Sequence, residues 1–148
     1  MLRAGVWLQL PAQRATLSAR DTALAARLAP LLAAGGYDPP WVRELAAASG
    51  EAEDRVRQLL AALARDGQAY AVVRDLYYDR AALAALAAIV AALARELGEV
   101  PAARFRDAAG LGRKRAIQVL EFFDRVGYTR RIGDVRRLRA DSGWLPPA

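Results

Sequence analysis

The chain has 148 residues, no cysteine and no histidine, a formal net charge of +6 at pH 7 and an isoelectric point near 10.4. This length suits one compact domain or two very small ones, and the two missing residue types exclude disulfides, thiolate nucleophiles, Cys/His zinc sites and histidine acid–base catalysis. The sequence also has no Gly-rich phosphate loop and no carboxylate pair spaced as in a hydrolase, so we expect no catalytic residue, no metal site and no cofactor.

The charge is distributed unevenly along the chain. Residues 1–99 hold eleven arginines and eleven acids, whereas residues 100–148 hold eleven cations and five acids. The whole excess therefore lies in the last third, which is typical of a module that binds a polyanion at its C-terminal end. The alternative is a solvated basic surface in a chain whose composition favours arginine and alanine.

Neither the start of the chain nor its most apolar segment indicates a membrane protein. The stretch MLRAGVWLQLPA is too short and too polar for a signal peptide. The longest uncharged apolar run, residues 81–94, has 14 residues, which is fewer than the roughly 17 to 20 needed to span a bilayer. We expect a soluble, cytoplasmic protein without a membrane partner.

The first half of the sequence predicts three helices and a hairpin. Ser18 and Asp21 are typical of a capping box, and the leucines that follow predict a helix to about residue 34, kinked at Pro30 and stopped by two glycines. Helical spacing continues in residues 41–49 and 51–67. The stretches AYAVV and LYYD then predict two short strands around a turn at Arg74 and Asp75.

The second half repeats this order. Residues 79–98 carry leucines and a valine at helical spacing, and further helices are predicted at 103–109 and 113–127. The stretch YTRRI-GD-VRRLR predicts a β-hairpin, because Gly-Asp between apolar residues favours a two-residue turn. Gly67 and Gly127, which follow the last helix of each half, lie 60 residues apart.

Helix, helix, turn, helix and hairpin, present twice, predict two tandem winged-helix domains in a mainly α fold with small β-hairpins. We place the domains at 18–79 and 80–140, with residues 1–17 as the remnant of a preceding winged domain or linker and 141–148 as a tail. The alternative is an arbitrary α+β domain with Ala-rich helices. Arg65 and Arg125, each two residues before the shared glycine, argue against that alternative.

The two copies differ at the start of their third helix. Glu53, Asp54 and Arg55 in the first copy align with Arg113, Lys114 and Arg115 in the second. A helix N-terminus disfavours cations, each costing roughly 0.3 to 1 kcal/mol when exposed, so the second arrangement suggests a bound phosphate. Together with the hairpin, these cations form one predicted basic surface, whose further members are Gln118, Arg130, Arg131, Arg136, Arg137 and Arg139.

Alternation along the hairpin would place Tyr128 and Ile132 inward and Thr129 and Arg131 outward, while the faces of the remaining arginines stay open. Phe122 either stacks on a base or, as we favour, packs on the first helix of its domain. The first wing is nearly uncharged, and we expect its aromatic side chains to pack against the neighbouring domain or another protein. These are Tyr70, Tyr77 and Tyr78.

Residues 105–139, FRDAAGLGRKRAIQVLEFFDRVGYTRRIGDVRRLR, resemble the C-terminal winged-helix domain of the bacterial selenocysteine-specific elongation factors, the SelB family. In that family an FRD…RK…LLE-FD-G-TRR-GD-R-LR pattern recurs. Residues 7–21 and 35–46 are similar to the stretch that leads into the penultimate winged helix. The resemblance is weakest in residues 80–104. It implies a C-terminal fragment or truncated reading frame that lacks the GTP-binding half and is not an enzyme.

The resemblance further implies a function in selenocysteine incorporation. The last winged helix would bind an mRNA stem-loop just downstream of a UGA codon, the selenocysteine insertion element, as a monomer. The first would be a spacer or a contact surface for the small ribosomal subunit. By position, the RNA contacts would come from the helix start and the hairpin, through Arg113, Lys114, Arg115, Arg130, Arg131 and Arg136, with Gln118 as a further candidate.

Two other classes of function remain open. Winged helices most often read B-DNA through the third helix, so a DNA-binding transcription regulator is the main alternative. Against it, few outward residues of this helix after Arg115 are of the types that read bases, with Gln118 as the main candidate. No dimerisation helix is evident either. A protein–protein module is the other alternative, and it predicts that basic substitutions hardly change activity.

Overall fold

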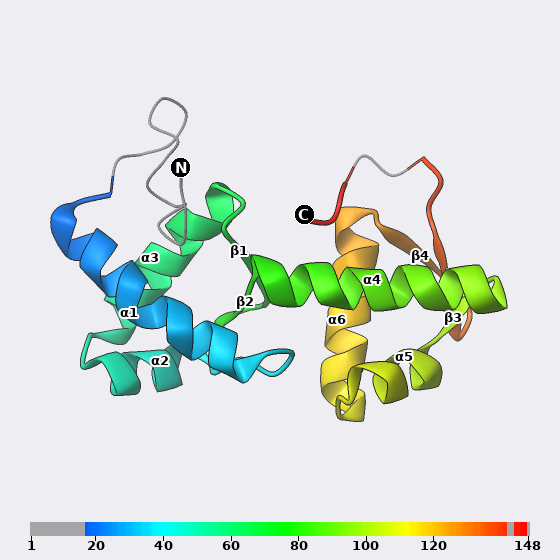
Figure 1. The fold of residues 1–148 in the computed structure, drawn as a ribbon, viewed down its shortest axis with the longest axis horizontal. Coiled ribbons are helices and arrows are strands. Elements are labelled where there is room, and N and C mark those ends of the chain that lie inside the picture. Colours follow the sequence, from blue (N-terminus) through cyan, green and yellow to red (C-terminus); the bar gives the residue numbers. More distant parts are fainter. Residues whose placement is uncertain (1–16, 142–143, 148) are drawn as a thin grey trace. The chain divides into compact units, whose positions relative to one another are not determined.

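A computed structural model describes residues 17–141 and 144–147, and it divides into two compact units, Met1–Asp79 and Arg80–Ala148. The predicted remnant at residues 1–17 lies outside the described residues except for Leu17. Each unit has three helices followed by a hairpin (Figure 1). The first unit contains α1 (Ala19–Gly35), α2 (Val42–Ser49), α3 (Glu53–Arg65), β1 (Ala69–Val73) and β2 (Leu76–Asp79). The second contains α4 (Arg80–Leu97), β3 (Val100–Pro101), α5 (Ala102–Ala109), α6 (Arg113–Val126), β4 (Thr129–Ile132) and β5 (Val135–Leu138).

The core of the first unit is built from the apolar faces of α1, α2 and α3. Ser18 begins α1 as predicted, because its hydroxyl accepts a hydrogen bond from the Asp21 backbone N–H at 3.0 Å. The helix continues through Pro30 to Gly35. Leucines and valines at helical spacing are fully buried between the three helices, namely Leu24, Leu28, Leu45, Val56 and Leu60.

The first wing is held to its domain by an ion pair at the turn. Asp75 lies between β1 and β2 with a positive φ of 64°, and it accepts two hydrogen bonds from Arg57 of α3, at 2.8 and 3.1 Å. This bidentate guanidinium lowers the pKa of the Asp75 carboxyl. The Asp75 carbonyl also accepts from Val42 N–H at 2.9 Å. The turn is therefore tied to α2 and α3 together.

The second unit packs α4, α5 and α6 around a core that includes Leu86, Phe105, Leu120 and Phe123. No helix in the described part of the chain is both long and apolar enough to cross a bilayer, α4 included. The Tyr128 hydroxyl donates a hydrogen bond to the Ala87 carbonyl at 3.0 Å, and burial raises the pKa of this hydroxyl.

The segment expected to be a free tail contributes to this core. Trp144 makes edge-to-face contacts with Phe122, Phe123 and Tyr128, at ring-centroid distances of 5.2 to 6.3 Å. Phe122 is 5 % exposed and therefore a packing residue, and the ring contacts found for it are with Phe123 of its own helix and with Trp144, whereas packing on the first helix of the domain stays a prediction. The chain therefore returns to its own domain after β5.

The sheet of the second unit has three strands in the order β3-β5-β4, all antiparallel. The sequence predicted β4 and β5 but missed β3, which has only two residues and ends in proline. A strand this short has no alternation of apolar and polar residues to detect. It forms only because α4 and α5, which flank it in the chain, place it beside β5. Val100 pairs with Arg136 there.

Two of the four predicted faces of the second hairpin were wrong, although Tyr128 is half-buried and Arg131 is exposed as expected. Thr129 is 1 % exposed and Ile132 is 43 % exposed, the reverse of the expectation. The physical reason is polar: the Thr129 hydroxyl donates to a carboxylate oxygen of Asp124 on α6 at 2.6 Å. A buried charge-assisted hydrogen bond sets the face instead of an apolar contact.

Candidate functional site

The start of α6 concentrates cations where a helix disfavours them. The helices α3 and α6 begin at Glu53 and Arg113, so the 60-residue alignment of the two copies is confirmed. Gly112, the N-cap of α6, offers no side-chain cap, and the first turn of α6 contains no acid. Arg113 and Lys114 are exposed and form no ion pair within the described residues. The first-turn N–H groups and two cations are therefore presented to solvent together.

At the start of α3 the counterparts of Arg113 and Lys114 are the acids Glu53 and Asp54, and Arg55, the counterpart of Arg115, is neutralised. Arg55 forms ion pairs with Asp21 at 2.9 Å and with Glu51 at 3.1 Å. Glu51 also pairs with Arg27 at 2.9 Å, and these arginines lower its pKa. The first helix start is therefore internally compensated, whereas Arg113 and Lys114 in the second have no ion-pair partner among the residues that the structure describes.

Arg115, in the same first turn, contacts Gln118, which lies about one turn further along α6. The Arg115 Nε–H donates to the Gln118 side-chain oxygen at 3.0 Å, and both side chains are half-buried. They are thus placed beside the exposed cations with part of their hydrogen-bonding capacity already used.

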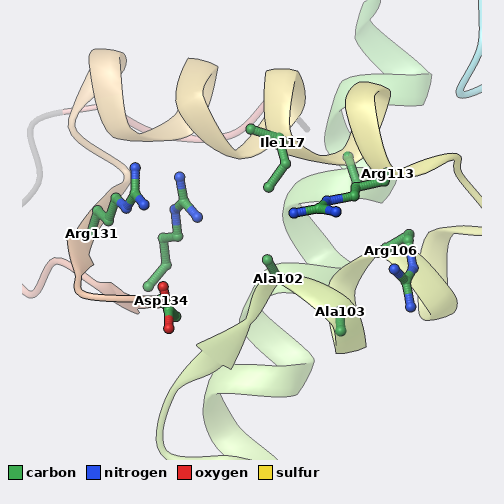
Figure 2. Close-up of a pocket in the computed structure, with 9 residues that line it drawn as sticks. Ala102, Ala103, Arg106, Arg113, Ile117, Arg131 and Asp134 are labelled. Carbon is green, nitrogen blue, oxygen red and sulfur yellow. The ribbon is translucent and has the colours of Figure 1, made fainter.

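A hollow of about 330 Å³ separates the start of α6 from the second wing. Figure 2 shows Arg113 reaching into it from α6 and Arg131 from the hairpin on the opposite side, with Ile117 above and Ala102 below. The small alanine side chains leave the floor open. Four arginines and one aspartate line this basic hollow, together with Ile117 and three alanines: Ala102, Ala103, Arg106, Arg113, Ala116, Ile117, Arg131, Asp134 and Arg136.

Arg136 differs from the other arginines of the basic hollow because its side chain is 2 % exposed. Its Nε and Nη2 atoms both donate to the same oxygen of Asp124, at 3.2 Å each. Asp124 also accepts from Thr129 at 2.6 Å. These three side chains, the Asp124 trio, join α6 to both strands of the wing. Arg136, which the sequence placed among the RNA contacts, is thus buried and paired with Asp124 at the edge of the hollow.

The first unit has apolar residues where the Asp124 trio lies. By the positions of α3, β1 and β2, the equivalents are Ala64, Ala69 and Tyr77, and all three belong to or contact the core. At this position the second wing is therefore attached to its third helix by charge and the first by apolar packing, whereas the ion pair of the first wing lies at its turn, between Asp75 and Arg57.

The structure also separates arginines that the sequence placed on one surface. Arg131 is opposite Arg136 in the ladder, and both line the basic hollow. Arg130 is opposite Arg137, and by strand alternation this pair points to the other side of the hairpin. The predicted set thus contributes Arg113, Arg131 and the buried Arg136 to the hollow and Lys114 beside it, but Arg130 lies elsewhere.

Sequence reasoning missed Arg106 and Asp134 as members of the basic hollow. Arg106 pairs with Asp107 at 3.1 Å and remains 38 % exposed, while Asp134 lies in the wing turn. No sequence spacing could identify them, since they come from α5 and the turn, which only the fold brings beside α6. Within the described ranges no group of three metal-ligating side chains is present.

Comparison with known protein families identifies both units. A family model described as "Selenocysteine-specific elongation factor, winged helix domain" matches residues 17–78, and one described as "Elongation factor SelB, winged helix" matches residues 91–138. The fold class of two tandem winged-helix domains is thereby confirmed. The chain is 41 % identical over 133 residues to the selenocysteine-specific elongation factor of Escherichia coli, which covers 90 % of the chain and 21 % of the relative.

A second relative and a solved structure agree with these matches. The Haemophilus influenzae selenocysteine-specific elongation factor is 33 % identical over 99 residues, covering 67 % of the chain and 16 % of the relative. A solved structure described as "Structure of the mRNA-binding domain of elongation factor SelB from E.coli in complex with SECIS RNA" superposes with a TM-score of 0.76 at 41 % identity, covering 83 % of this chain and 99 % of that one. The chain spans about one fifth of the length of the curated relatives it matches.

Proposed function

Since the chain belongs to the SelB family of selenocysteine-specific elongation factors, we propose that its second winged helix binds the mRNA stem-loop that directs UGA recoding. The observation that carries this proposal is the uncompensated helix start of α6 facing Arg131 across the basic hollow. The side chains of Arg113 and Arg131 reach into one space from opposite sides, and guanidinium groups in this arrangement are suited to phosphate oxygens.

The contact residues follow from exposure. Arg113, Lys114 and Arg131 are exposed and surround or adjoin the hollow, so they are the proposed phosphate contacts, with Arg106 at the edge. Arg115 and Gln118 support the helix start through their mutual hydrogen bond and keep part of their polar edge outward. Arg136 acts indirectly, because its ion pair with Asp124 fixes the strand that lies opposite Arg131.

The shape of RNA agrees with this assignment. The major groove of A-form RNA is too narrow for side-chain reading, so proteins recognise loops, bulges and splayed-out bases together with the backbone. A hollow bounded by a helix start and a wing can hold a phosphate and an adjoining nucleotide of a loop. The alanines below and Ile117 above leave room for a base beside the arginines of the hollow.

For the first winged helix we infer a supporting function. Its helix start is acidic and compensated, so it offers no comparable anion site. It is proposed as a spacer and as a surface for contact with the small ribosomal subunit. The contribution of this chain is RNA binding rather than GTP hydrolysis, and the protein acts as a translation factor in the cytoplasm.

Binding of the purified chain to a selenocysteine-insertion hairpin tests the proposal. The comparison nucleic acids are a loop-scrambled RNA hairpin and a DNA duplex of equal length, each measured at several salt concentrations. With about three to five phosphates contacted, log affinity for the hairpin should fall with log salt at a slope of roughly −2 to −4. Equal affinity for all three nucleic acids, or tighter binding to the DNA, would overturn the proposal.

A matched pair of variants locates the surface. Arg113→Ala with Lys114→Ala should weaken hairpin binding at least about tenfold and make the salt slope shallower by roughly 1.5 to 2. Arg65→Ala with Arg95→Ala removes the same charge from exposed positions of α3 and α4 and should leave the affinity nearly unchanged. If both double variants lose affinity equally, net charge rather than this surface determines binding.

A further inference from the structure

The opposite side of the second wing carries its own uncompensated charge. This outer face consists of Arg130, Ile132 and Arg137, with Leu138 and Arg139 at its end, and it borders a second hollow of about 460 Å³. Arg130 and Arg137 are directly opposite each other in the ladder. Like charges in that position destabilise a sheet, so folding alone gives no reason for this pair.

Acidic residues neutralise only part of the outer face. Asp141 pairs with Arg139 at 3.2 Å, and the nearby Arg139 and Arg130 contribute to lowering the pKa of the Asp141 carboxyl. The Arg137 side chain is exposed and forms no hydrogen bond or ion pair with any residue that the structure describes. The outer face therefore keeps a net positive charge next to exposed apolar side chains, since Ile132 and Leu138 are 43 % and 38 % exposed.

The first wing shows what this face contains when it is used only for folding. The equivalents of Arg130 and Arg137 are Tyr70 and Tyr78, which are also paired in the ladder. Tyr78 is fully buried, and its hydroxyl donates to the Tyr37 carbonyl at 2.7 Å. The same face is thus covered by its own domain in the first copy, and open and basic in the second.

The outer face is separate from the basic hollow. Successive strand residues point to opposite sides of a hairpin, so Arg130 and Arg131 face in opposite directions. Two hollows, one lined by Arg131 and Arg136 and one by Arg130 and Arg137, lie on the two sides. A ligand held in the basic hollow therefore does not fill the second one.

We propose that the outer face binds the sugar–phosphate backbone of a second, separate segment of structured RNA while the hairpin occupies the basic hollow. This inference rests on the proposed function and goes beyond it, because it makes the wing a bridge between two RNAs. Guanidinium forks bind phosphate oxygens bidentately, and the outer face is continuous with an RNA-binding wing. Its charge complements a polyanion, and Ile132 and Leu138 can contact sugars.

A two-RNA binding experiment tests the bridge. The full chain is saturated with labelled hairpin and titrated with an unrelated short RNA duplex, and the ternary complex is followed by electrophoretic mobility and analytical ultracentrifugation. Arg130→Gln with Arg137→Gln should weaken duplex binding about tenfold and leave hairpin affinity within about twofold. Arg113→Ala with Lys114→Ala should do the opposite. Thermal unfolding of the Arg130/Arg137 variant should be unchanged or shifted upward, since cross-strand repulsion is removed.

The outcomes separate this inference from the proposed function. Normal hairpin binding without a ternary complex overturns the bridge alone, as does a duplex that competes with the hairpin for one surface. Loss of hairpin specificity overturns the proposed function. Poly-glutamate that binds the outer face as tightly as the duplex would show that the face takes an acidic protein instead, and would also overturn the inference.

Discussion

Replacing Asp124 by alanine should destabilise the second winged helix far more than an ordinary surface substitution. The change leaves Arg136, whose side chain is 2 % exposed, without the carboxylate that accepts two of its hydrogen bonds, and it leaves Thr129 without its acceptor. Breaking a buried ion pair from one side costs about 3 to 5 kcal/mol. Because the Asp124 side chain is 23 % exposed, water can partly replace it, and we expect about 3 kcal/mol.

This loss of stability is large enough to measure by calorimetry. For a domain of 60 to 100 residues, 1 kcal/mol shifts the melting temperature by about 4 to 8 °C, so Asp124→Ala should lower the transition of the second unit by roughly 12 to 24 °C. The first unit should melt as before. Asp107→Asn is the matched control, because it breaks the exposed pair with Arg106, and exposed pairs contribute about 0 to 1 kcal/mol.

A variant that copies the first unit isolates the charge. Asp124→Ala, Thr129→Ala and Arg136→Tyr together introduce the residues found at the equivalent positions, and they remove the buried charge with its partners. This triple variant should recover much of the lost stability, since replacing a whole buried ion pair by apolar groups is often neutral or stabilising. A shift below about 5 °C for Asp124→Ala, or a triple variant less stable than the single one, would refute the reasoning.

Three further predictions concern other sites. Arg113→Glu with Lys114→Asp introduces the two residues found at the start of α3. This double variant should raise the melting temperature slightly through the helix dipole and abolish hairpin binding. A lower melting temperature would show that the two cations are structural. The Asp75 pKa is lowered by Arg57, so the stability from this pair is present above the ordinary carboxyl pKa near 4 and is lost as pH falls through the folded value. Acid titration should therefore show the first unit losing stability below about pH 4, and Asp75→Asn should flatten that dependence. Trp144→Ala should destabilise the second unit by about 2 to 4 kcal/mol in denaturant unfolding, whereas a free tail would show no change.

The elements that could be predicted are those whose signals are local. The Ser18 cap, the glycines that end helices and the helical spacing of leucines act within a few residues, and α1, α3, α4 and α6 form where these signals lie. Strand β3 and the packing of Trp144 could not be predicted in this way. Both depend on contacts between segments distant in sequence, and neither carries a periodic pattern.

The candidate site was predictable as a region but not residue by residue. The cations at the start of α6 stand out because they oppose a helix dipole, which is a local effect. The hairpin arginines do not differ from one another in the sequence. Which of them meets Asp124 depends on the side of the hairpin on which α6 lies.

The amino-acid sequence by itself predicts the two winged helices and the location of the charge excess. It also shows the contrast between Glu53 and Arg113. Only the folded domain determines that Arg136 is buried, that Arg131 lines the basic hollow and that Arg130 points away from it. The reason is that composition and helix dipoles depend only on residues that are close together in the sequence. The exposure of a strand side chain depends instead on which other element packs against the strand. In this domain the Asp124 carboxylate on α6 bonds Thr129 and Arg136, and these contacts determine which hairpin face is buried.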